Sequence, residues 1–227
     1  MIYIIMEGLI GAGKSTILKK LQEYLPFILP DGWKSYILYE NVNEWISDGS
    51  LEFSYENPKK GIFPLQIKSI MSKKYDFIIE NKGIKNDSFI ENKDKSIIFI
   101  ERSVYSAHFI FGEMHYEKKN LTSHEWKLCS ELYNIFKNQI DYCFYIDVPP
   151  IIAFERLNIR NRHAEKTLGY PYLVSLEQKY KEHFPTKVPF PVKNINGKLT
   201  IDEIVDEISK TILHILRFTN DKIKDTK

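Results

Sequence analysis

Gly8-Leu9-Ile10-Gly11-Ala12-Gly13-Lys14-Ser15-Thr16 decides the fold of this 227-residue chain, because it fits the phosphate-binding pattern G-x-x-x-x-G-K-[ST] at every position. Residues 1–6 form a short, apolar segment before it, of the kind that is buried on both faces of a parallel sheet. From Ile17 to Leu25, apolar residues recur at helical spacing. This order of strand, loop and helix predicts an α/β protein that binds nucleotide phosphates. The alternative is a glycine-rich turn that matches by chance.

The residue types of this stretch suit a phosphate group. Residues with little or no Cβ let several backbone N–H groups approach phosphate oxygens closely. The helix that begins near Lys14 adds the positive end of its dipole. The Lys14 ammonium can reach the β and γ phosphates, and the Ser15 hydroxyl can ligate a bridging Mg²⁺ ion. The predicted phosphate-binding residues are Gly8, Gly11, Ala12, Gly13, Lys14, Ser15 and Thr16.

Composition narrows the class of protein. The chain has 32 basic and 30 acidic residues and a formal net charge of +2, so its overall charge does not demand nucleic acid or an anionic membrane as a partner. Its two cysteines, Cys129 and Cys143, show no metal or redox spacing and suit a reducing compartment. We find no targeting segment or membrane span before the first strand. We therefore expect a cytoplasmic protein with a single domain, residues 1–219, and a charged flexible tail, residues 220–227.

Charged residues stand where two predicted strands end. Residues 36–39 read as a short strand that ends at Glu40, and residues 96–100 as a buried strand followed by Glu101 and Arg102. Ligands of open parallel sheets bind beyond the carboxyl ends of the strands. A charge pair there is costly unless it meets ligands, so Glu101 is a candidate ligand for Mg²⁺. The alternatives are a helix cap or solvated charge at Glu40 and a structural ion pair between Glu101 and Arg102.

Periodicity and breaking residues predict the other elements. Residues 46–61 are polar and read as irregular, and a lysine- and asparagine-rich surface loop ends at Lys95. Pro149 and Pro150 suit the first turn of a new helix. The other predicted helices are 62–79, 104–113, 122–138, 169–181 and 201–216, and the other predicted strands are 142–147 and 188–193.

Three arginines lie within two turns after Pro150, namely Arg156, Arg160 and Arg162. Arg156 and Arg160 are four positions apart and share one face of the helix. Such a cluster is either a solvated stripe or a lid that closes over phosphates and neutralises the charge of the transferred group. The phosphate-binding loop favours the lid, which we place at about residues 156–168.

Five motifs resemble the deoxyribonucleoside kinase family, which holds deoxycytidine, deoxyguanosine and mitochondrial-type thymidine kinases. They occur in the family's order, and the resemblance covers most of the chain. Besides the phosphate loop, the motifs are Glu40-x-Val42-x-x-Trp45, with Asn41 where the family has proline; Tyr55-Glu56-Asn57-Pro58 followed by Gln66; Glu101-Arg102-Ser103-Val104-Tyr105-Ser106; and Arg156-x-x-x-Arg160-x-Arg162-x-x-Glu165.

The resemblance implies a P-loop kinase fold with a doubly wound five-stranded parallel sheet, flanked by helices that also form a homodimer. It implies transfer of the ATP γ-phosphate to the 5′-hydroxyl of a deoxynucleoside. Phosphoryl transfer needs in-line positioning, a proton acceptor and positive charge around the phosphoryl group. The implied roles are Glu40 as base, Arg102 at the same site, Ser15 and Glu101 at Mg²⁺, Lys14, Arg156, Arg160 and Arg162 at the phosphates, Tyr55 and Glu165 at the 3′-hydroxyl, Gln66 at the base edge and Trp45 packed on the nucleoside.

Two departures from the family bear on the preferred base. Ala107 and Lys73 stand where some members carry aspartate and arginine. The resemblance implies that Ala107 walls the base pocket, where a small apolar side chain leaves room for the 5-methyl group of thymine. Lys73 argues partly against this, because a cation near the base could attract an acceptor-rich purine. We expect a pyrimidine substrate, with thymidine ahead of the purines; the alternative is that residue 107 only packs its helix.

The phosphate loop also occurs in other classes of protein. A nucleoside monophosphate kinase of the thymidylate kinase type would need further arginines where Glu40 stands, because a carboxylate repels an acceptor phosphate. A GTP switch protein would need N-K-x-D after a strand, whereas Asn92-Lys93-Asp94-Lys95 has its acid one place early. A nucleotide-binding module without catalysis could lose Glu40, Glu101 or Arg102, yet all three are present.

Overall fold

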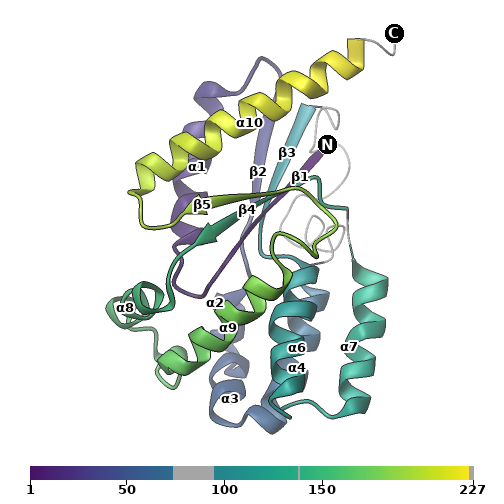
Figure 1. Cartoon of the computed structure of the whole chain (residues 1–227), viewed down its shortest axis with the longest axis vertical. Coiled ribbons are helices and arrows are strands. Elements are labelled where there is room, and N and C mark those ends of the chain that lie inside the picture. Colours follow the sequence, from purple (N-terminus) through teal and green to yellow (C-terminus); the bar gives the residue numbers. More distant parts are fainter. Residues whose placement is uncertain (74–94, 138, 225–227) are drawn as a thin grey trace.

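A five-stranded parallel sheet forms the centre of the protein (Figure 1). The computed structural model describes residues 1–73, 95–137 and 139–224. The strands lie in the order β2-β3-β1-β4-β5, so the chain winds outward from β1 in both directions, and the predicted doubly wound sheet is confirmed. The strands are β1 (Ile2–Gly8), β2 (Lys34–Leu38), β3 (Ser96–Glu101), β4 (Tyr142–Asp147) and β5 (Val192–Asn196).

The last strand begins later than the sequence predicted. Pairing between β4 and β5 starts with Cys143 opposite Val192, whereas the predicted strand began at residue 188. Pro189 and Pro191 carry no backbone N–H, so this stretch cannot donate a regular series of hydrogen bonds to a neighbouring strand.

Helices surround the sheet and continue beyond its carboxyl edge (Figure 1). A short π-helical stretch, η2, follows β3, and a single 3₁₀ turn, η3, lies in the lid. The bounds are α1 (Lys14–Ile28), α2 (Val42–Ser47), α3 (Ser50–Glu56), α4 (Pro58–Met71), η2 (Ser106–Gly112), α6 (Glu113–Glu117), α7 (Ser123–Phe136), α8 (Pro150–Arg160), η3 (His163–Glu165), α9 (Tyr170–His183) and α10 (Ile201–Lys224).

Residues 46–61 are helical, contrary to the prediction of an irregular segment. Gly49 adopts a φ of 74° between α2 and α3, and Pro58 occupies the first turn of α4. Helices α2 and α3 have only 6 and 7 residues, which is too short for a clear periodic pattern. Trp45 and Leu51 are buried against the lid, so tertiary packing stabilises these helices.

Three other predicted elements differ in extent. Helix α4 ends at Met71, and residues 77–79, predicted as part of it, lie outside the described residues, as does the polar loop up to residue 94. The helix predicted at 104–113 contains the π-helical stretch η2, a form that often occurs at functional sites. Helix α10 continues to Lys224, into the stretch predicted as a tail.

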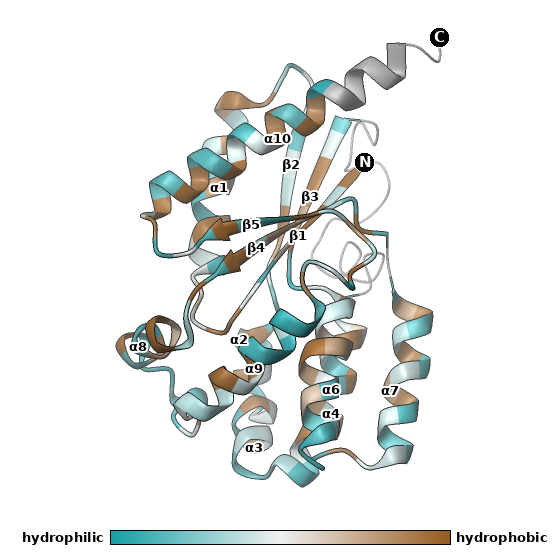
Figure 2. Ribbon diagram, viewed as in Figure 1, coloured by the Kyte–Doolittle hydropathy of each residue, from teal (hydrophilic) through white to brown (hydrophobic). Residues whose placement is uncertain are grey.

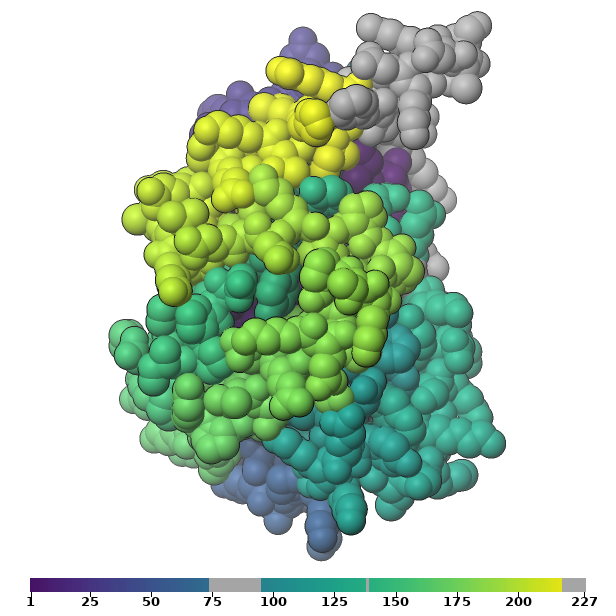
Figure 3. Space-filling model, viewed as in Figure 1, coloured from purple at the N-terminus to yellow at the C-terminus, as the bar shows by residue number. Residues whose placement is uncertain are grey.

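The strands supply most of the core. Ile5, Phe99 and Phe144 are fully buried, and burial of such a side chain contributes about 1.5–3 kcal/mol. Hydrophobic residues run along β1 and β3 in Figure 2. Helix α1 packs on β1, β2 and β3, and α10 packs on α1 and β5. In the space-filling view, α9 (green) and α10 (yellow) cover much of the visible face (Figure 3).

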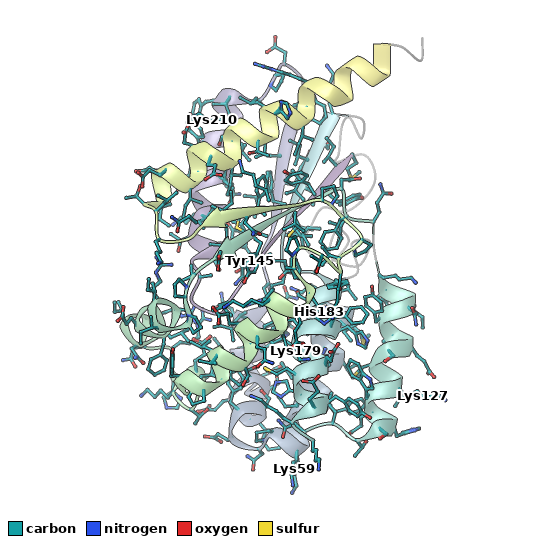
Figure 4. All side chains as sticks on the ribbon, viewed as in Figure 1. Lys59, Lys127, Tyr145, Lys179, His183 and Lys210 are labelled. Carbon is teal, nitrogen blue, oxygen red and sulfur yellow. The ribbon has the colours of Figure 1, made fainter. Side chains whose placement is uncertain are left out.

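Helix α9 is tied to α6 by a cluster of charges. Lys179 Nζ lies 3.0 Å from Glu113, 2.6 Å from Glu117 and 2.8 Å from Glu182. Burial opposes the charge on Lys179, but the hydrogen bonds that its ammonium donates to the carboxylates outweigh burial and raise the Lys179 pKa. Lys179 and His183 lie together on α9 in Figure 4. This cluster fixes the position of α9, which also carries cavity residues described below.

Both cysteines are free and buried, Cys129 in a small cluster beside η2 and Cys143 in the main core. Cys129 packs in the same cluster as Ala107, and neither cysteine lines the cavity described below. Among the helices of residues 1–73, 95–137 and 139–224, none combines the length and the apolar character that a membrane span requires.

Candidate active site

A cavity of about 370 Å³ opens at the carboxyl ends of β1 and β3, a volume that suits a small ligand. Predicted residues from both ends of the sequence come together on its wall. They are Gly11, Gly13, Lys14, Ser15, Thr16, Glu40, Trp45, Tyr55, Gln66, Glu101, Arg102, Arg160, Arg162 and Glu165.

The phosphate-binding loop packs closely on β4 and α8. A Cβ atom at Gly8 would lie 2.6 Å from the carbonyl oxygen of Ile146, and one at Gly11 would lie 2.5 Å from that of Ala153. Both glycines also adopt positive φ angles, 140° and 84°. Glycine is therefore required at these two positions by the packing of the loop on the protein itself, in addition to any approach of phosphate.

Lys14 is buried at the bottom of the loop. Its Nζ donates hydrogen bonds to the carbonyl oxygens of Gly8 at 3.1 Å and Leu9 at 2.8 Å. Burial lowers the pKa of Lys14 to about 7, and the positive charge of Arg102 is the second-largest cause; the negative charge of Glu101 opposes the shift. Because phosphate oxygens carry negative charge, a nucleotide bound here would favour the protonated ammonium.

Ser15 and Glu101 meet beside the loop. Glu101 ends β3, which pairs with β1, and Ser15 Oγ donates a hydrogen bond to Glu101 Oε1 at 2.7 Å. The backbone N–H of Glu40 lies 3.4 Å from Glu101 Oε2. A hydroxyl and a carboxylate in contact are hard oxygen donors, so these two residues fit the Mg²⁺ ion that the phosphate loop implies.

Glu40 is held between two cations. Its Oε2 accepts a hydrogen bond from Arg102 Nε at 3.0 Å, and its Oε1 lies 3.4 Å from Lys73 Nζ. Burial alone would raise the pKa of Glu40, but Lys73, Arg102 and Lys14 together lower it below its usual value. Lys73 also donates to the carbonyl oxygen of Glu101 at 3.0 Å. Lys73 therefore contacts the Glu40 carboxylate and the end of β3, a position that the sequence analysis did not predict.

The alternative of a Glu101–Arg102 ion pair is not what the structure shows, because the Arg102 guanidinium turns to Glu40. Arg102 has a φ of 64°, a left-handed conformation that costs a residue with a side chain roughly 1–3 kcal/mol. Its Nη1 donates to the carbonyl oxygen of Gly8 at 3.1 Å and to the Tyr180 hydroxyl at 2.7 Å. Three hydrogen bonds thus hold this guanidinium, and the Arg102 backbone N–H also donates to the carbonyl oxygen of Met6 at 3.0 Å.

Glu7 is a buried carboxylate that the sequence analysis missed. Its Oε2 accepts a hydrogen bond from Tyr180 at 2.9 Å, and its Oε1 accepts one from Ser103 at 2.8 Å. Tyr180 in turn contacts Arg102, so Glu7 supports the arginine through one intermediate side chain. An acidic residue inside an apolar strand, directly before the phosphate loop, was the available indication, because a buried charge needs partners.

The lid is folded over the cavity. Arg160 forms an ion pair with Glu165 Oε2, and Arg162 Nη1 donates to Glu165 Oε1 at 3.1 Å. His163 Nδ1 lies 2.9 Å from Glu52 of α3. Arg160, Arg162 and Glu165 therefore lie next to one another in the cavity wall.

Gly8, Ala12, Arg156 and Ala107 do not line the cavity within the described part of the chain. Arg156 instead donates hydrogen bonds to the carbonyl oxygens of Ala12 at 3.3 Å and Gly197 at 3.0 Å, so it braces the phosphate loop against the turn after β5. The expectation that all three lid arginines face the same ligand is therefore wrong for Arg156 in this conformation.

Ala107 lies behind the cavity wall. Its side chain packs in an apolar cluster with Ile70, Val104 and Cys129. Its carbonyl oxygen accepts a hydrogen bond from Gln66 Nε2. The structure thus places the Ala107 side chain away from the cavity, contrary to the expectation that it walls the base pocket, and connects its backbone to Gln66.

The cavity has further residues that sequence reasoning did not select. Phe111 lies under the Arg102 guanidinium, whose central carbon is 4.7 Å from the ring centroid. His115 and Tyr172 also line the wall. Phe111 belongs to η2, His115 to α6 and Tyr172 to α9, and no sequence motif singled them out.

Comparison with known proteins adds a decisive observation. The sequence model of the deoxynucleoside kinases matches residues 4–218. The chain belongs to the deoxynucleoside kinase family. This confirms the resemblance and identifies the chain as an ATP-dependent kinase with a deoxynucleoside as its acceptor, rather than a monophosphate kinase or a GTP switch.

Relatives of this deoxynucleoside kinase span nearly its whole length. Putative kinase protein 143R of Invertebrate iridescent virus 6 is 30% identical over 217 residues, which are 95% of this chain and 99% of the viral protein. Deoxycytidine kinase of Homo sapiens is 26% identical over 226 residues, covering 88% of this chain and 82% of the human one. A solved structure of deoxyadenosine kinase from M. mycoides has the same fold, with a TM-score of 0.74, 24% identity and coverage of 94% of this chain and 100% of that one.

Proposed function

We propose that this kinase transfers the ATP γ-phosphate to the 5′-hydroxyl of a deoxynucleoside with Glu40 as the proton acceptor. The observation that carries the proposal is the Glu40 carboxylate, held by Arg102 and Lys73 in the cavity that Lys14 and Ser15 also line. A carboxylate here suits a hydroxyl acceptor, whereas it would repel an acceptor that already carries phosphate. Incubation with labelled ATP and a panel of deoxynucleosides and their monophosphates tests this directly. Labelling of monophosphates alone would contradict it.

On the acceptor side, Glu40 orients the 5′-hydroxyl and receives its proton as the bond to phosphorus forms. Arg102 fixes the carboxylate through its Nε and is itself fixed by Tyr180 and Gly8, so the position of the base is rigid. A low pKa keeps Glu40 ionised at neutral pH. A weak base is sufficient, because the transferred phosphoryl group is loosely bonded in the transition state and little proton transfer is needed early.

On the donor side, the loop N–H groups and Lys14 bind the β and γ phosphates. Arg160 and Arg162 of the lid supply further positive charge at the transferred group. Ser15 and Glu101 would hold Mg²⁺, which supplies charge neutralisation across the β and γ phosphates when bound. Arg156 braces the loop in this conformation, and we propose that it reaches the phosphates only if its contacts with Ala12 and Gly197 open.

Tyr55 and Glu165 are proposed to bind the sugar. Both line the cavity, Tyr55 from α3 and Glu165 from the lid, and together they present a donor and an acceptor to a hydroxyl group. Trp45, also in the wall, can pack on the nucleoside.

Tyr55→Phe and Glu165→Gln should each reduce kcat/KM for nucleosides with a free 3′-hydroxyl roughly tenfold, because a lost hydrogen bond to a substrate hydroxyl costs about 1–3 kcal/mol. The same variants should change kcat/KM for 3′-deoxy analogues much less. Tyr24→Phe, an exposed tyrosine of α1, is the matched control. Equal losses for both classes of nucleoside would show that neither side chain contacts the 3′ position.

Gln66 supports a preference for thymidine among the pyrimidines. Its Nε2 donates to the Ala107 carbonyl, and the opposite amide orientation would place two oxygens against each other. The amide orientation is therefore fixed, and among the hydrogen bonds of the described residues none occupies Oε1 or the second Nε2 hydrogen, which can accept from and donate to a base. Thymine offers N3–H and O4, the matching donor and acceptor; cytosine bound in the same position presents an acceptor at N3 and a donor at N4, so both contacts would be mismatched. Ala107 thus acts through its backbone in this proposal, and its side chain has no part.

We expect kcat/KM for thymidine to exceed that for deoxycytidine roughly tenfold, the cost of mismatched hydrogen bonds. Gln66→Glu, which replaces the Nε2 donor by an oxygen, should reduce this ratio. The panel includes deoxyguanosine, because guanine presents the same donor and acceptor as thymine. A higher value for deoxycytidine would contradict the role of Gln66, and a higher value for deoxyguanosine would contradict the pyrimidine preference.

We further propose a role in salvage of DNA precursors, with a homodimer as the active form. The product of the reaction, a deoxynucleoside monophosphate, is a precursor of DNA, which supports salvage. Leu128 and Ile135 are exposed apolar residues of α7 that support an association through helices. Sedimentation velocity measures the oligomeric state directly.

A further inference from the structure

Three polar side chains form a row at one wall of the cavity. Asn120 Nδ2 lies 3.2 Å from His115 Nδ1, and His115 Nε2 lies 3.3 Å from the Tyr172 hydroxyl. His115 and Tyr172 line the cavity, and Asn120 lies outside it. None of the roles described above uses this row.

Hydrogen-bond chemistry gives the row a direction. The Asn120 amide nitrogen can only donate, so His115 Nδ1 must accept. Burial, with a smaller contribution from Lys118, lowers the pKa of His115 to about 4, so the imidazole is neutral and its one proton resides on Nε2. Nε2–H then donates to the Tyr172 oxygen, and the hydroxyl hydrogen of Tyr172 must point elsewhere.

The Tyr172 hydroxyl is therefore a directed donor. Burial also raises the Tyr172 pKa, so the phenol keeps its proton. Among the hydrogen bonds of the described residues, none provides an acceptor for this hydrogen, and Tyr172 lines the cavity. A donor held in this way is arranged to meet an acceptor oxygen of a ligand.

The neighbours of Tyr172 indicate which part of the ligand it meets. Its ring contacts the Tyr55 ring edge to face, with the centroids 6.0 Å apart. Glu165 lines the same cavity and acts electrostatically on Tyr55. Tyr55 and Glu165 are the residues proposed to bind the 3′-hydroxyl of the sugar, so Tyr172 lies at the sugar end.

We propose that Tyr172 is a further sugar-binding residue, which donates a hydrogen bond to the 3′-oxygen of the acceptor nucleoside and is oriented by His115 and Asn120. A hydroxyl group offers one hydrogen and two lone pairs. Glu165 can accept the hydrogen, and Tyr55 and Tyr172 can donate to the two lone pairs, so the 3′-hydroxyl would be fully satisfied. This inference rests on the proposed function of the cavity.

Tyr172→Phe tests the donor, because it removes a single oxygen and keeps the ring. We expect kcat/KM for a 2′-deoxynucleoside to fall five- to tenfold, mostly through KM, and that for the 2′,3′-dideoxy analogue to fall less than twofold. Tyr170→Phe is the matched control, since Tyr170 lies on the same helix, is exposed and is outside the cavity; it should behave as wild type. An equal fall for both substrates, or no fall, would overturn the proposal.

The tautomer of His115 is a second, independent measurement. Nitrogen-15 NMR of the folded protein should show His115 neutral at pH 7, with its proton on Nε2, the resonance being assigned by its absence from His115→Gln. A proton on Nδ1 would reverse the row and overturn the orientation of Tyr172. If the wild-type protein phosphorylates no nucleoside, the proposed function itself is rejected. If the wild type is active and Tyr172→Phe leaves kcat/KM unchanged, only the inference about Tyr172 is rejected.

Discussion

Lys14→Met is expected to reduce kcat by roughly 10³-fold or more, the scale of losing a charge that stabilises the transferring phosphoryl group. Its ammonium lies at the bottom of the phosphate loop, where it donates to the Gly8 and Leu9 carbonyl oxygens. A 10³-fold loss corresponds to about 4 kcal/mol of transition-state stabilisation. Methionine retains the buried hydrophobic stem of the lysine side chain, so the fold should persist.

Steady-state kinetics with ATP and a deoxynucleoside measure the loss, and thermal unfolding measures the fold. Stability should change little, because the variant also removes a buried cation that lies in the field of Arg102. Lys19→Met, at an exposed position on the same helix, is the control and should retain wild-type kcat. Wild-type turnover by a folded Lys14→Met protein would remove the phosphate loop from the mechanism.

Glu40→Gln should lower kcat by roughly 10²-fold or more while nucleoside binding is largely kept, since general-base and positioning effects have this size. The amide is nearly isosteric with the carboxylate but cannot take the proton of the 5′-hydroxyl. It also leaves Arg102 and Lys73 facing a neutral group. A loss of stability of about 1–3 kcal/mol is therefore expected, because both cations are buried.

Calorimetric titration with the nucleoside separates binding from chemistry in this variant. Glu44→Gln is the matched control, because Glu44 is an exposed residue of α2 whose side chain contacts only Asn41 among the hydrogen bonds of the described residues. If Glu40→Gln bound the nucleoside poorly yet turned over at the normal rate, Glu40 would be a binding group and the proton would have another acceptor.

Local sequence was sufficient for the phosphate loop and for the residues at strand ends. Loop geometry depends on glycines at fixed spacing and on a strand and helix that adjoin it, all within about 25 consecutive residues. The sequence also predicted that Glu40, Glu101 and Arg102 lie close together, because the carboxyl ends of parallel strands share one edge of the sheet. Contacts such as Ser15 with Glu101 and Glu40 with Arg102 follow from that rule.

The sequence did not predict the short helices or the directions in which individual side chains point. Helices α2 and α3 depend on packing against the lid, which lies more than a hundred residues away in the chain. Lys73 and Ala107 occupy positions that the family resemblance placed near the base, yet the Lys73 ammonium reaches Glu40 and the Ala107 side chain turns into an apolar cluster. A residue's position in a motif does not determine which way its side chain points.

The sequence by itself determined the class of reaction, because phosphate binding and the acids at strand ends are local patterns repeated in a known order. Only the tertiary structure decided how Arg102 beside Glu40 and the Tyr172 wall of the cavity are supported. Glu7 meets Tyr180 across 173 positions of sequence, and His115 meets Tyr172 across 57. Such pairs produce no periodic pattern in the sequence, because each residue by itself looks like an ordinary buried polar or aromatic side chain. Their function arises only when the packing of α6, α9 and β1 brings donor and acceptor within hydrogen-bonding distance.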